Sequence, residues 1–265
     1  MGSGRGAPIG DDALPPRAHD PAAALPLPTA PQRPADDPHD ATESTPNMAA
    51  RTALIAGATG LVGRELLAGL LADLGVAQVH SLGRREPPLQ HAKLVAHRVD
   101  FAALPPLPPV DEVYLALGTT IKVAGSREAF RAVDHDANLA VARAARAAGA
   151  RRAALVSAMG ASPSSRVFYS RVKGELEEAL AGLGFEALVI ARPSLLAGDR
   201  ASLAQPERPG ERIGLAVSRV LGPLIPADLR PITAATVARA LLRELPRAQG
   251  RRVMPSGDMQ RLGAG

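Results

Sequence analysis

The sequence predicts an α/β protein of the Rossmann type, in which helices cover both faces of a doubly wound parallel sheet and a small C-terminal region binds substrate. Short runs of Val, Ile, Leu and Ala alternate with longer amphipathic stretches, which is the pattern of parallel strands joined by crossover helices. A glycine-rich turn at residues 57–63 follows the first of these runs, as it does in dinucleotide-binding folds. With 265 residues, of which 46% are hydrophobic, the chain is long enough for one such domain.

The elements are predicted in order from the spacing of the apolar residues. Strands are expected at residues 52–56, 76–82, 94–99, 112–117, 153–157, 187–191 and 252–254. Helices are expected at residues 61–74, 127–148, 168–183, 211–221 and 234–245. Thr233 is suited to cap the last helix. Four prolines within residues 105–109 exclude a regular helix there, so this crossover is expected to be a loop.

The first 47 residues differ in composition from the rest. They are rich in proline, lack aromatic residues and show no helical or strand period, which predicts a disordered tail. Met48 comes just before the first strand, so one interpretation makes Met48 the true start of the protein, and the other keeps a genuine flexible tail. The folded domain is expected over residues 48–265, with its substrate region at about 195–250.

Composition narrows the function further. The absence of cysteine excludes disulfides and thiol catalysis, and the 6 histidines lack the paired spacings of zinc sites, so no metal is expected. No apolar run is long enough to span a membrane, and no signal peptide is recognisable, which predicts a cytoplasmic protein. Residues 1–50 carry a net charge of −4 and residues 51–265 carry +9. A basic domain suits an anionic small molecule, whereas the lack of a dense Lys/Arg run disfavours nucleic acid.

The turn Gly57-Ala58-Thr59-Gly60-Leu61-Val62-Gly63 has the spacing G-x-x-G-x-x-G between a strand and a helix. Glycines at these positions permit a tight turn, a close approach of the backbone to a pyrophosphate and close packing of the helix on the sheet. The free N–H groups of the following helix favour phosphates. An ordinary glycine-rich turn is the alternative. The predicted coenzyme-binding residues here are Gly57, Thr59, Gly60, Leu61, Val62 and Gly63.

The end of the second strand indicates which dinucleotide binds. Sites that prefer NAD(H) end this strand with an acidic residue that bonds the ribose 2′-hydroxyl. Here Arg84 and Arg85 follow the strand, and two guanidinium groups suit a 2′-phosphate. The sequence therefore predicts NADP(H) in preference to NAD(H), with solvated loop charges as the alternative.

Tyr169 and Lys173 form a Y-x-x-x-K pattern on one face of a predicted helix. A lysine ammonium beside a tyrosine hydroxyl favours the phenolate, which lets tyrosine act as a general acid toward a carbonyl oxygen or as a base in the reverse direction. Ser157 ends the preceding strand, and its hydroxyl is placed to bond a substrate carbonyl. The predicted catalytic residues are Tyr169, Lys173 and Ser157, although a packing role for Tyr169 and a turn role for Ser157 are the alternatives.

These features together resemble the short-chain dehydrogenase/reductase superfamily over residues 51–260. Residues 117–120, 156–161 and 168–175 resemble in particular the NADPH-binding Tat-interacting-protein subgroup of its extended and atypical branches. The resemblance implies that the coenzyme is also lined by Asp100 near the adenine, by Leu117, Gly118 and Thr119, and by Lys173 and Pro193 at the nicotinamide end. Extended members often carry Asn early in the long helix, where this chain has Asp134, so a fourth catalytic Asn is not expected. Asp134-His135-Asp136 is expected to be a helix surface or a local hydrogen-bonding cluster.

The function predicted from these residues is an NADP(H)-dependent oxidoreductase of a small carbonyl or alcohol, with proton transfer by Tyr169 and Lys173. Two alternatives remain open: a non-catalytic NADPH-binding regulatory or sensor protein, and a nucleotide-sugar epimerase or dehydratase. The expected partner is a small-molecule substrate, and a protein partner or a homo-oligomer is left open.

Overall fold

The computed structural model describes residues 50–197 and 226–263. Its main feature is a seven-stranded sheet in the order β3-β2-β1-β4-β5-β6-β9, in which every strand pair is parallel. The strands are β1 (Arg51–Ala56), β2 (Val76–Gly83), β3 (Leu94–Arg98), β4 (Glu112–Leu115), β5 (Arg152–Val156), β6 (Ala187–Arg192) and β9 (Gly250–Pro255). The strand order reverses between β1 and β4. In open α/β sheets, a ligand crevice forms at such a reversal, at the carboxyl ends of the strands.

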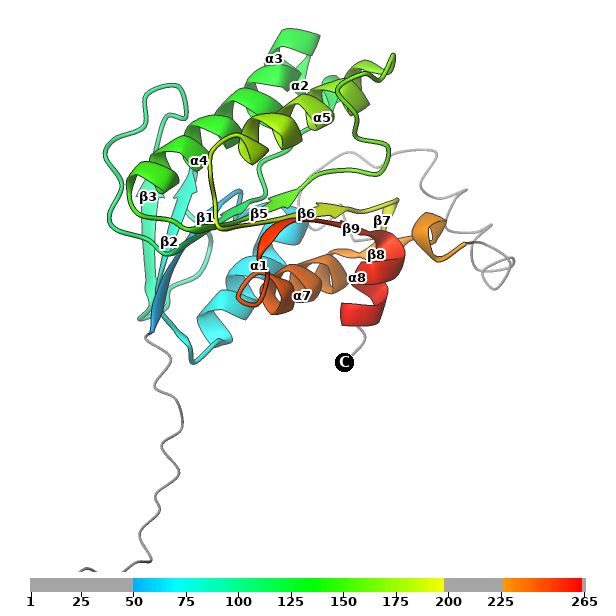
Figure 1. The fold of residues 1–265 in the computed structure, drawn as a ribbon. Coiled ribbons are helices and arrows are strands. Elements are labelled where there is room, and N and C mark those ends of the chain that lie inside the picture. Colours follow the sequence, from blue (N-terminus) through cyan, green and yellow to red (C-terminus); the bar gives the residue numbers. More distant parts are fainter. Residues whose placement is uncertain (1–49, 198–225, 264–265) are drawn as a thin grey trace, which may run out of the picture. The chain divides into compact units, whose positions relative to one another are not determined.

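Helices cover both faces of the sheet (Figure 1). One face carries α1 (Leu61–Ala72) and α7 (Ala234–Glu244), with α8 (Ser256–Gly263) packed on α7. The other face carries α4 (Asn138–Ala147) and α5 (Phe168–Ala181). The doubly wound α/β fold predicted from the sequence is therefore confirmed.

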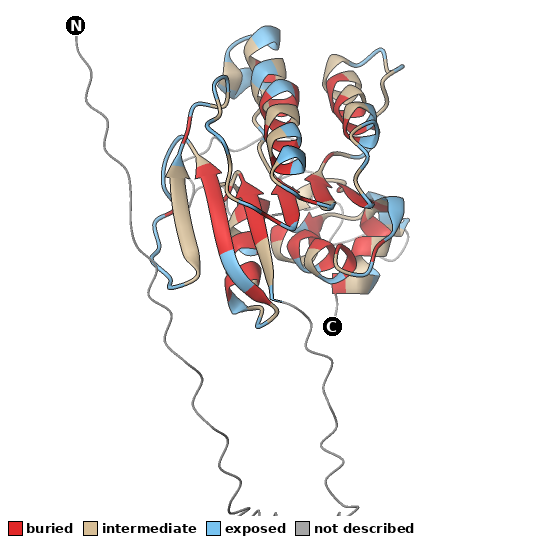
Figure 2. Ribbon diagram, turned by 60° about the vertical axis from the view of Figure 1, so that its left-hand side comes forward, coloured by how far each residue is buried: buried red, intermediate tan, exposed pale blue. Residues whose placement is uncertain are grey.

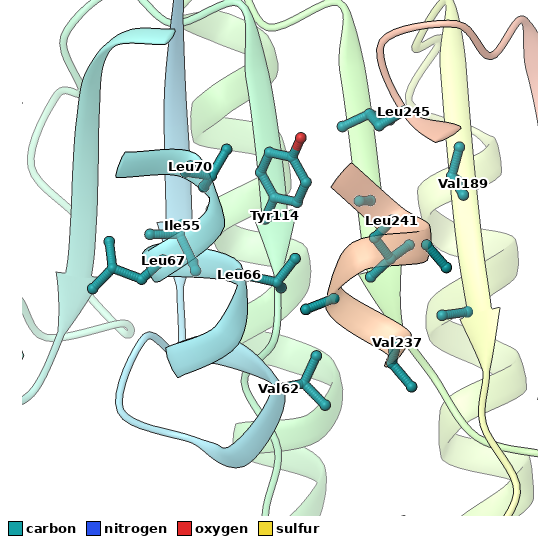
Figure 3. Close-up of a cluster of buried hydrophobic side chains, with 14 of the residues drawn as sticks. Ile55, Val62, Leu66, Leu67, Leu70, Tyr114, Val189, Val237, Leu241 and Leu245 are labelled. Atoms are coloured by element: carbon teal, nitrogen blue, oxygen red, sulfur yellow. The ribbon is translucent and has the colours of Figure 1, made fainter. Parts of the chain in front are cut away.

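The core lies between the sheet and these two helix layers, so the inner strands are buried on both sides (Figure 2). On the face of α1 and α7, Leu66 and Leu241 point toward the aromatic ring of Tyr114 on β4, which is fully buried (Figure 3). Each large apolar side chain removed from water in this way stabilises the fold by about 1.5–3 kcal/mol. The packed layers hold the strand ends in fixed positions, which the site at their carboxyl edge requires.

Most predicted elements agree with the structure to within a few residues, and Thr233 caps α7 as expected, since its side chain accepts the N–H of Thr236. The long helix predicted at 127–148 differs. It consists of α3 (Arg127–Arg131), a π-helical turn η1 (Ala132–Ala137) and α4. The wider π turn is not visible in apolar spacing, because it depends on what its side chains meet in the fold.

Several short elements were not predicted. They are α2 (Ile121–Ala124), the two-stranded pair β7 (Leu196–Ala197) and β8 (Ile232–Thr233), the single turn η4 (Ala227–Leu229), and α8. The helix expected at 211–221, the N-terminal tail and much of the expected substrate region lie outside the described residues.

The described residues contain neither a membrane-spanning helix nor a metal-binding group. None of the helices in residues 50–197 and 226–263 is long and apolar enough to cross a bilayer. Over the same ranges, no group of three or more His, Asp or Glu side chains is arranged to hold a metal ion.

Candidate active site

The residues predicted to bind coenzyme or to catalyse follow the carboxyl ends of six neighbouring strands, or lie on the helix after β5. The glycine loop follows β1, Arg84 and Arg85 follow β2, Asp100 follows β3, Leu117–Thr119 follow β4, Ser157 follows β5, and Pro193 follows β6. Because parallel strands end at the same edge of a sheet, these segments share one edge. The backbone N–H of Met159, after β5, donates to the carbonyl of Pro193 at 2.9 Å, which joins two of the segments.

The glycine loop is packed so tightly that two of its three glycines, Gly57 and Gly63, leave no room for a side chain. Gly57 has φ +93°, and a Cβ there would lie 2.5 Å from the carbonyl carbon of Ala116, which follows β4. A Cβ on Gly63 would lie 1.9 Å from the carbonyl oxygen of Gly57. Helix α1 starts directly after Gly60, and no side chain caps its N-terminus. The loop thus places its glycine backbone and an uncapped helix N-terminus at the reversal point of the sheet, which fits the pyrophosphate of a dinucleotide.

Arg84 lines a pocket at the carboxyl ends of β2 and β3. The pocket has a volume of about 490 Å³ and is lined by Arg84, Arg98, Val99 and Asp100. Arg98 ends β3, next to Gly83 of β2 in the sheet register. Arg85 is exposed and is not among the lining residues. The pocket therefore combines two guanidinium groups with one carboxylate, and the second guanidinium comes from a residue that the sequence did not single out.

Tyr169 and Lys173 lie one turn apart on α5, as predicted. The ring of Tyr169 packs on Phe130 of α3, with 5.5 Å between the ring centroids. The amine of Lys173 is buried and contacts the carboxylate of Asp134, with 2.7 Å between Nζ and Oδ1. Burial lowers the pKa of Lys173, but Asp134 and Tyr169 more than offset it, and the resulting pKa is above the ordinary value for lysine. Lys173 is therefore a fixed positive charge beside Tyr169.

The loop after β4 connects this pair to the glycine loop. A Cβ on Gly118 would lie 4.0 Å from Nζ of Lys173, and Gly57 packs against Ala116 at the start of the same loop. The side chain of Asn138 holds the loop, because its Nδ2 donates to the carbonyl of Leu117 at 3.1 Å. The glycine loop, residues 117–119 and Lys173 thus form one contiguous structure.

Ser157, whose expected role toward a substrate carbonyl stays a prediction, has a hydrogen-bond partner within the fold. Its hydroxyl donates to Oε1 of Glu177 at 2.6 Å, and both residues are buried. Two arginines hold the same carboxylate: Arg192 through bonds of 3.0 Å from Nε and 2.5 Å from Nη2, and Arg251 at 3.5 Å. The hydrogen bond to Glu177 raises the pKa of Arg192 above its usual value. The Ser157 hydroxyl therefore belongs to a buried polar cluster in this structure.

Four residues of the site escaped the sequence reasoning: Arg98, Asp134, Asn138 and Glu177. The expectation for the Asp134-His135-Asp136 segment was partly wrong, because Asp134 and His135 are buried and Asp134 pairs with Lys173. His135 does form the expected local bond, to Asp136 at 2.7 Å. Glu177 could have been found from the sequence, because it follows Lys173 by four residues and so lies on the same face of the predicted helix.

Comparison with known proteins adds relatives and fold neighbours, although no family model matches the chain. The protein "fmp52, mitochondrial" of Emericella nidulans is 38% identical over 183 residues, which is 65% of this chain and 76% of that protein. The protein "fmp52-1, mitochondrial" of Aspergillus terreus is 41% identical over 162 residues, which is 57% of this chain and 68% of that protein.

Solved structures resemble the fold at low sequence identity. MoeE5, in complex with UDP-glucuronic acid and NAD, has a TM-score of 0.59 at 18% identity and covers 78% of this chain and 76% of its own. A short chain dehydrogenase family protein from Francisella tularensis has a TM-score of 0.56 at 11% identity and covers 78% and 98%. ADP-L-glycero-D-manno-heptose-6-epimerase from Helicobacter pylori has a TM-score of 0.56 at 15% identity and covers 78% and 77%.

These comparisons correct one expectation and support another. The prediction of a cytoplasmic protein is wrong, because the relatives are named as mitochondrial proteins. The resemblance to short-chain dehydrogenases/reductases is confirmed for the fold, and the finer resemblance to the Tat-interacting-protein subgroup stays a prediction. The chain belongs to the family of Fmp52 proteins, and its fold is that of the short-chain dehydrogenases/reductases.

Proposed function

We propose that the protein is an NADP(H)-dependent oxidoreductase that acts on a small carbonyl or alcohol substrate. The observation that carries the proposal is the contiguity of two features at one sheet edge. A glycine loop with no room for a Cβ at Gly57 and Gly63 lies at the reversal of the strand order, and the loop after β4 links it to a buried, charged Lys173 beside Tyr169. The first feature fits a dinucleotide, and the second fits acid–base chemistry at a carbonyl oxygen.

In this mechanism, Tyr169 donates its phenolic proton to the carbonyl oxygen of the substrate, and in the reverse direction its phenolate takes the proton from the alcohol. Lys173 stabilises the phenolate through its charge, and its remaining N–H groups would hold the nicotinamide ribose. The bound coenzyme would supply or accept the hydride. Phe130 fixes the orientation of the Tyr169 ring, since their ring centroids are 5.5 Å apart.

Ser157 has a smaller part in the proposal than Tyr169. We expected its hydroxyl to orient the substrate carbonyl, but the hydroxyl donates to Glu177. It would have to turn away from a buried carboxylate to reach a substrate. Proton transfer therefore stays with Tyr169, and Ser157 could orient the carbonyl only if its hydroxyl left Glu177.

The preference for NADP(H) is supported by the pocket after β2 and β3. Arg84 and Arg98 line it together, and a 2′-phosphate is bound well by paired guanidinium groups. Asp100 lines the same pocket and would face the adenine end of the coenzyme. Arg85 would contribute its charge from outside the pocket.

A nucleotide-sugar substrate is the second candidate, because one fold neighbour is described in complex with UDP-glucuronic acid and NAD and another is an epimerase. Such a substrate would use the same Tyr169 and Lys173, so the substrate test must include it. A purely regulatory NADPH-binding protein would need no proton donor at Tyr169.

The deciding experiment measures coenzyme binding and turnover separately. Calorimetric titration with NADPH and NADH tests binding, and the absorbance of the reduced nicotinamide follows turnover on a panel of carbonyls, alcohols and nucleotide-sugars. Tyr169→Phe should lower turnover by about a hundredfold or more and keep coenzyme binding. Tyr114→Phe is the matched control, because Tyr114 is the other of the 2 tyrosines and is fully buried on β4. Tight binding without turnover on any substrate would favour the regulatory alternative, and no binding of either coenzyme would end the proposal.

A further inference from the structure

We propose that Asp134 is a positioning residue of this reaction: it keeps the buried amine of Lys173 in its charged form and anchors it to the loop after β4. The inference rests on the proposed function, in which Lys173 acts beside Tyr169. Asp134 would act through Lys173 and would not contact the substrate.

The contacts of Asp134 are divided between the two parts of the site. Its Oδ1 lies 2.7 Å from Nζ of Lys173, and the two side chains are only 1% and 5% exposed. Its Oδ2 accepts the backbone N–H of Thr119 at 2.7 Å. One carboxylate therefore joins the catalytic helix to the loop predicted to line the coenzyme.

The π-helical turn η1 carries Asp134 at this position. Asn138, at the end of the turn, donates from Nδ2 to the carbonyls of Asp134 at 3.2 Å and Leu117 at 3.1 Å. The same side chain thus bonds the turn and the loop, and it is fully buried. The π turn and Asn138 hold the carboxylate between Thr119 and Lys173.

Asp134 is also the carboxylate available to balance the charge of Lys173. The ionisable groups that act on Lys173 are Asp134 on η1, and Tyr169 and Glu177 on its own helix. Glu177 is already paired with Arg192 and Arg251. Within the described residues, the carboxylate that forms an ion pair with Lys173 is that of Asp134.

A buried ammonium needs such a partner. Desolvation disfavours the charged form, so a fully buried lysine without a partner loses its proton at a pH several units lower than an exposed lysine. Lys173 is buried to that degree, so removal of the carboxylate should make it lose its proton at a pH about two units lower or more. A neutral amine would no longer stabilise the phenolate of Tyr169.

The test reads the charge of Lys173 directly. The chain holds only three lysines, Lys93, Lys122 and Lys173, so protein labelled with ¹⁵N at the lysine side chains gives few signals. The Lys173 signal is identified by its loss in Lys173→Met. In Asp134→Asn, its titration midpoint should fall by about two pH units or more. A midpoint within a few tenths of a unit of the parent's would overturn the proposal.

Asp136→Asn is the matched control, because it removes the same charge from the same helical turn, and the Asp136 side chain is 59% exposed. It should leave the midpoint of Lys173 unchanged. The lysine titration needs neither coenzyme nor substrate, so it remains readable if the proposed function fails. Where turnover is found, kcat of Asp134→Asn should fall as pH rises through the new midpoint, and kcat of Asp136→Asn should follow the parent profile.

Asp134→Asn could unfold, and the double variant Asp134→Asn/Lys173→Met then decides. If the double variant folds and the single variant does not, the uncompensated ammonium caused the unfolding, as the proposal requires. If both unfold while Lys173→Met alone folds, Asp134 has a structural role independent of Lys173, and the proposal is overturned.

Discussion

The hydroxyl of Ser157 donates to the carboxylate of Glu177 across 2.6 Å, in a buried contact that joins the end of β5 to α5. Because the hydroxyl proton of Ser157 is donated to Glu177 and not to a substrate, Ser157→Ala should lower kcat/KM by less than about tenfold. Tyr169→Phe should lower it by about 10²–10⁴-fold. Steady-state kinetics on the best substrate of the panel measures both. Equal losses in the two variants would mean that Ser157 turns toward the substrate during the reaction.

Glu177 should contribute measurably to stability. Glu177→Gln removes the charge that binds Arg192 and Arg251, and hydrogen bonds to charged groups contribute about 1.5–3 kcal/mol. We expect a loss of about 2 kcal/mol in the free energy of unfolding, measured by urea denaturation. Glu178→Gln is the control, because Glu178 is the exposed neighbour on the same helix. A loss in both variants of the same size would contradict a specific role for the Glu177 cluster.

Gly63→Ala should disrupt the glycine loop. The new methyl group would lie 1.9 Å from the carbonyl oxygen of Gly57, so the loop or α1 must move. Overpacking of this kind costs about 1–3 kcal/mol, and coenzyme affinity should fall more than tenfold. Gly182→Ala is the control, since its Cβ would meet only ordinary contacts at 3.6 Å. Thermal melting and calorimetry with NADPH measure the two effects, and unchanged affinity in Gly63→Ala would argue against a coenzyme at this loop.

Arg84 and Arg98 should determine the preference for the 2′-phosphate. Each replacement by alanine should weaken NADPH binding by about tenfold or more and leave NADH binding nearly unchanged. The reason is that only NADPH carries the ribose 2′-phosphate that the pocket is proposed to hold. Arg85→Ala should have the smaller effect of the three, and Arg143→Ala, on the exposed surface of α4, should have none. Calorimetric titration with both coenzymes decides. A parent protein that binds NADH as tightly as NADPH would refute the preference.

Two histidines should make the fold sensitive to acid. His80 is buried on β2, with its Nδ1 2.9 Å from Nε2 of His97 on β3. Burial and the neighbouring His97 lower the pKa of His80, so the folded state binds a proton less readily than the unfolded chain. Its contribution to stability is complete above the unfolded value of about 6.5 and is lost as pH falls below it.

The measurement is the free energy of unfolding between pH 8 and pH 5. His80→Gln should reduce the slope by up to one proton, about 1.4 kcal/mol per pH unit. His91→Gln replaces an exposed histidine and should keep the parent slope. If His80→Gln keeps that slope as well, the pair is not the acid-sensitive element.

The sequence predicted what depends on local pattern, and it failed where distant segments meet. Apolar spacing located β1 and α5, and the glycine and Tyr/Lys spacings located the loop after β1 and the shared helix of Tyr169 and Lys173. The pattern could not reveal that Asp134 is buried, because an acidic residue in a helix is ordinarily solvated. Its burial follows from the π turn and from Lys173 on another helix, which only the folded chain brings together.

Glu177 and Arg98 were missed for the same reason. A glutamate within a helix and an arginine at a strand end are common in a sequence with 22% charged residues, and the spacing of Glu177 from Lys173 does not show which arginines it contacts. Arg251 reaches Glu177 from β9, and Arg98 joins Arg84 because β3 pairs with β2. Such partners depend on strand order, which apolar periodicity does not specify.

Strand β9 pairs with β6, although the two are separated by more than fifty positions in the chain. The pairing brings Arg251 to Glu177 on α5. During synthesis, the domain therefore cannot complete its sheet until β9 has left the ribosome. Until then, the backbone N–H and C=O groups of β6 that pair with β9 have no strand partner. A nascent chain stalled before position 250 should therefore bind chaperones.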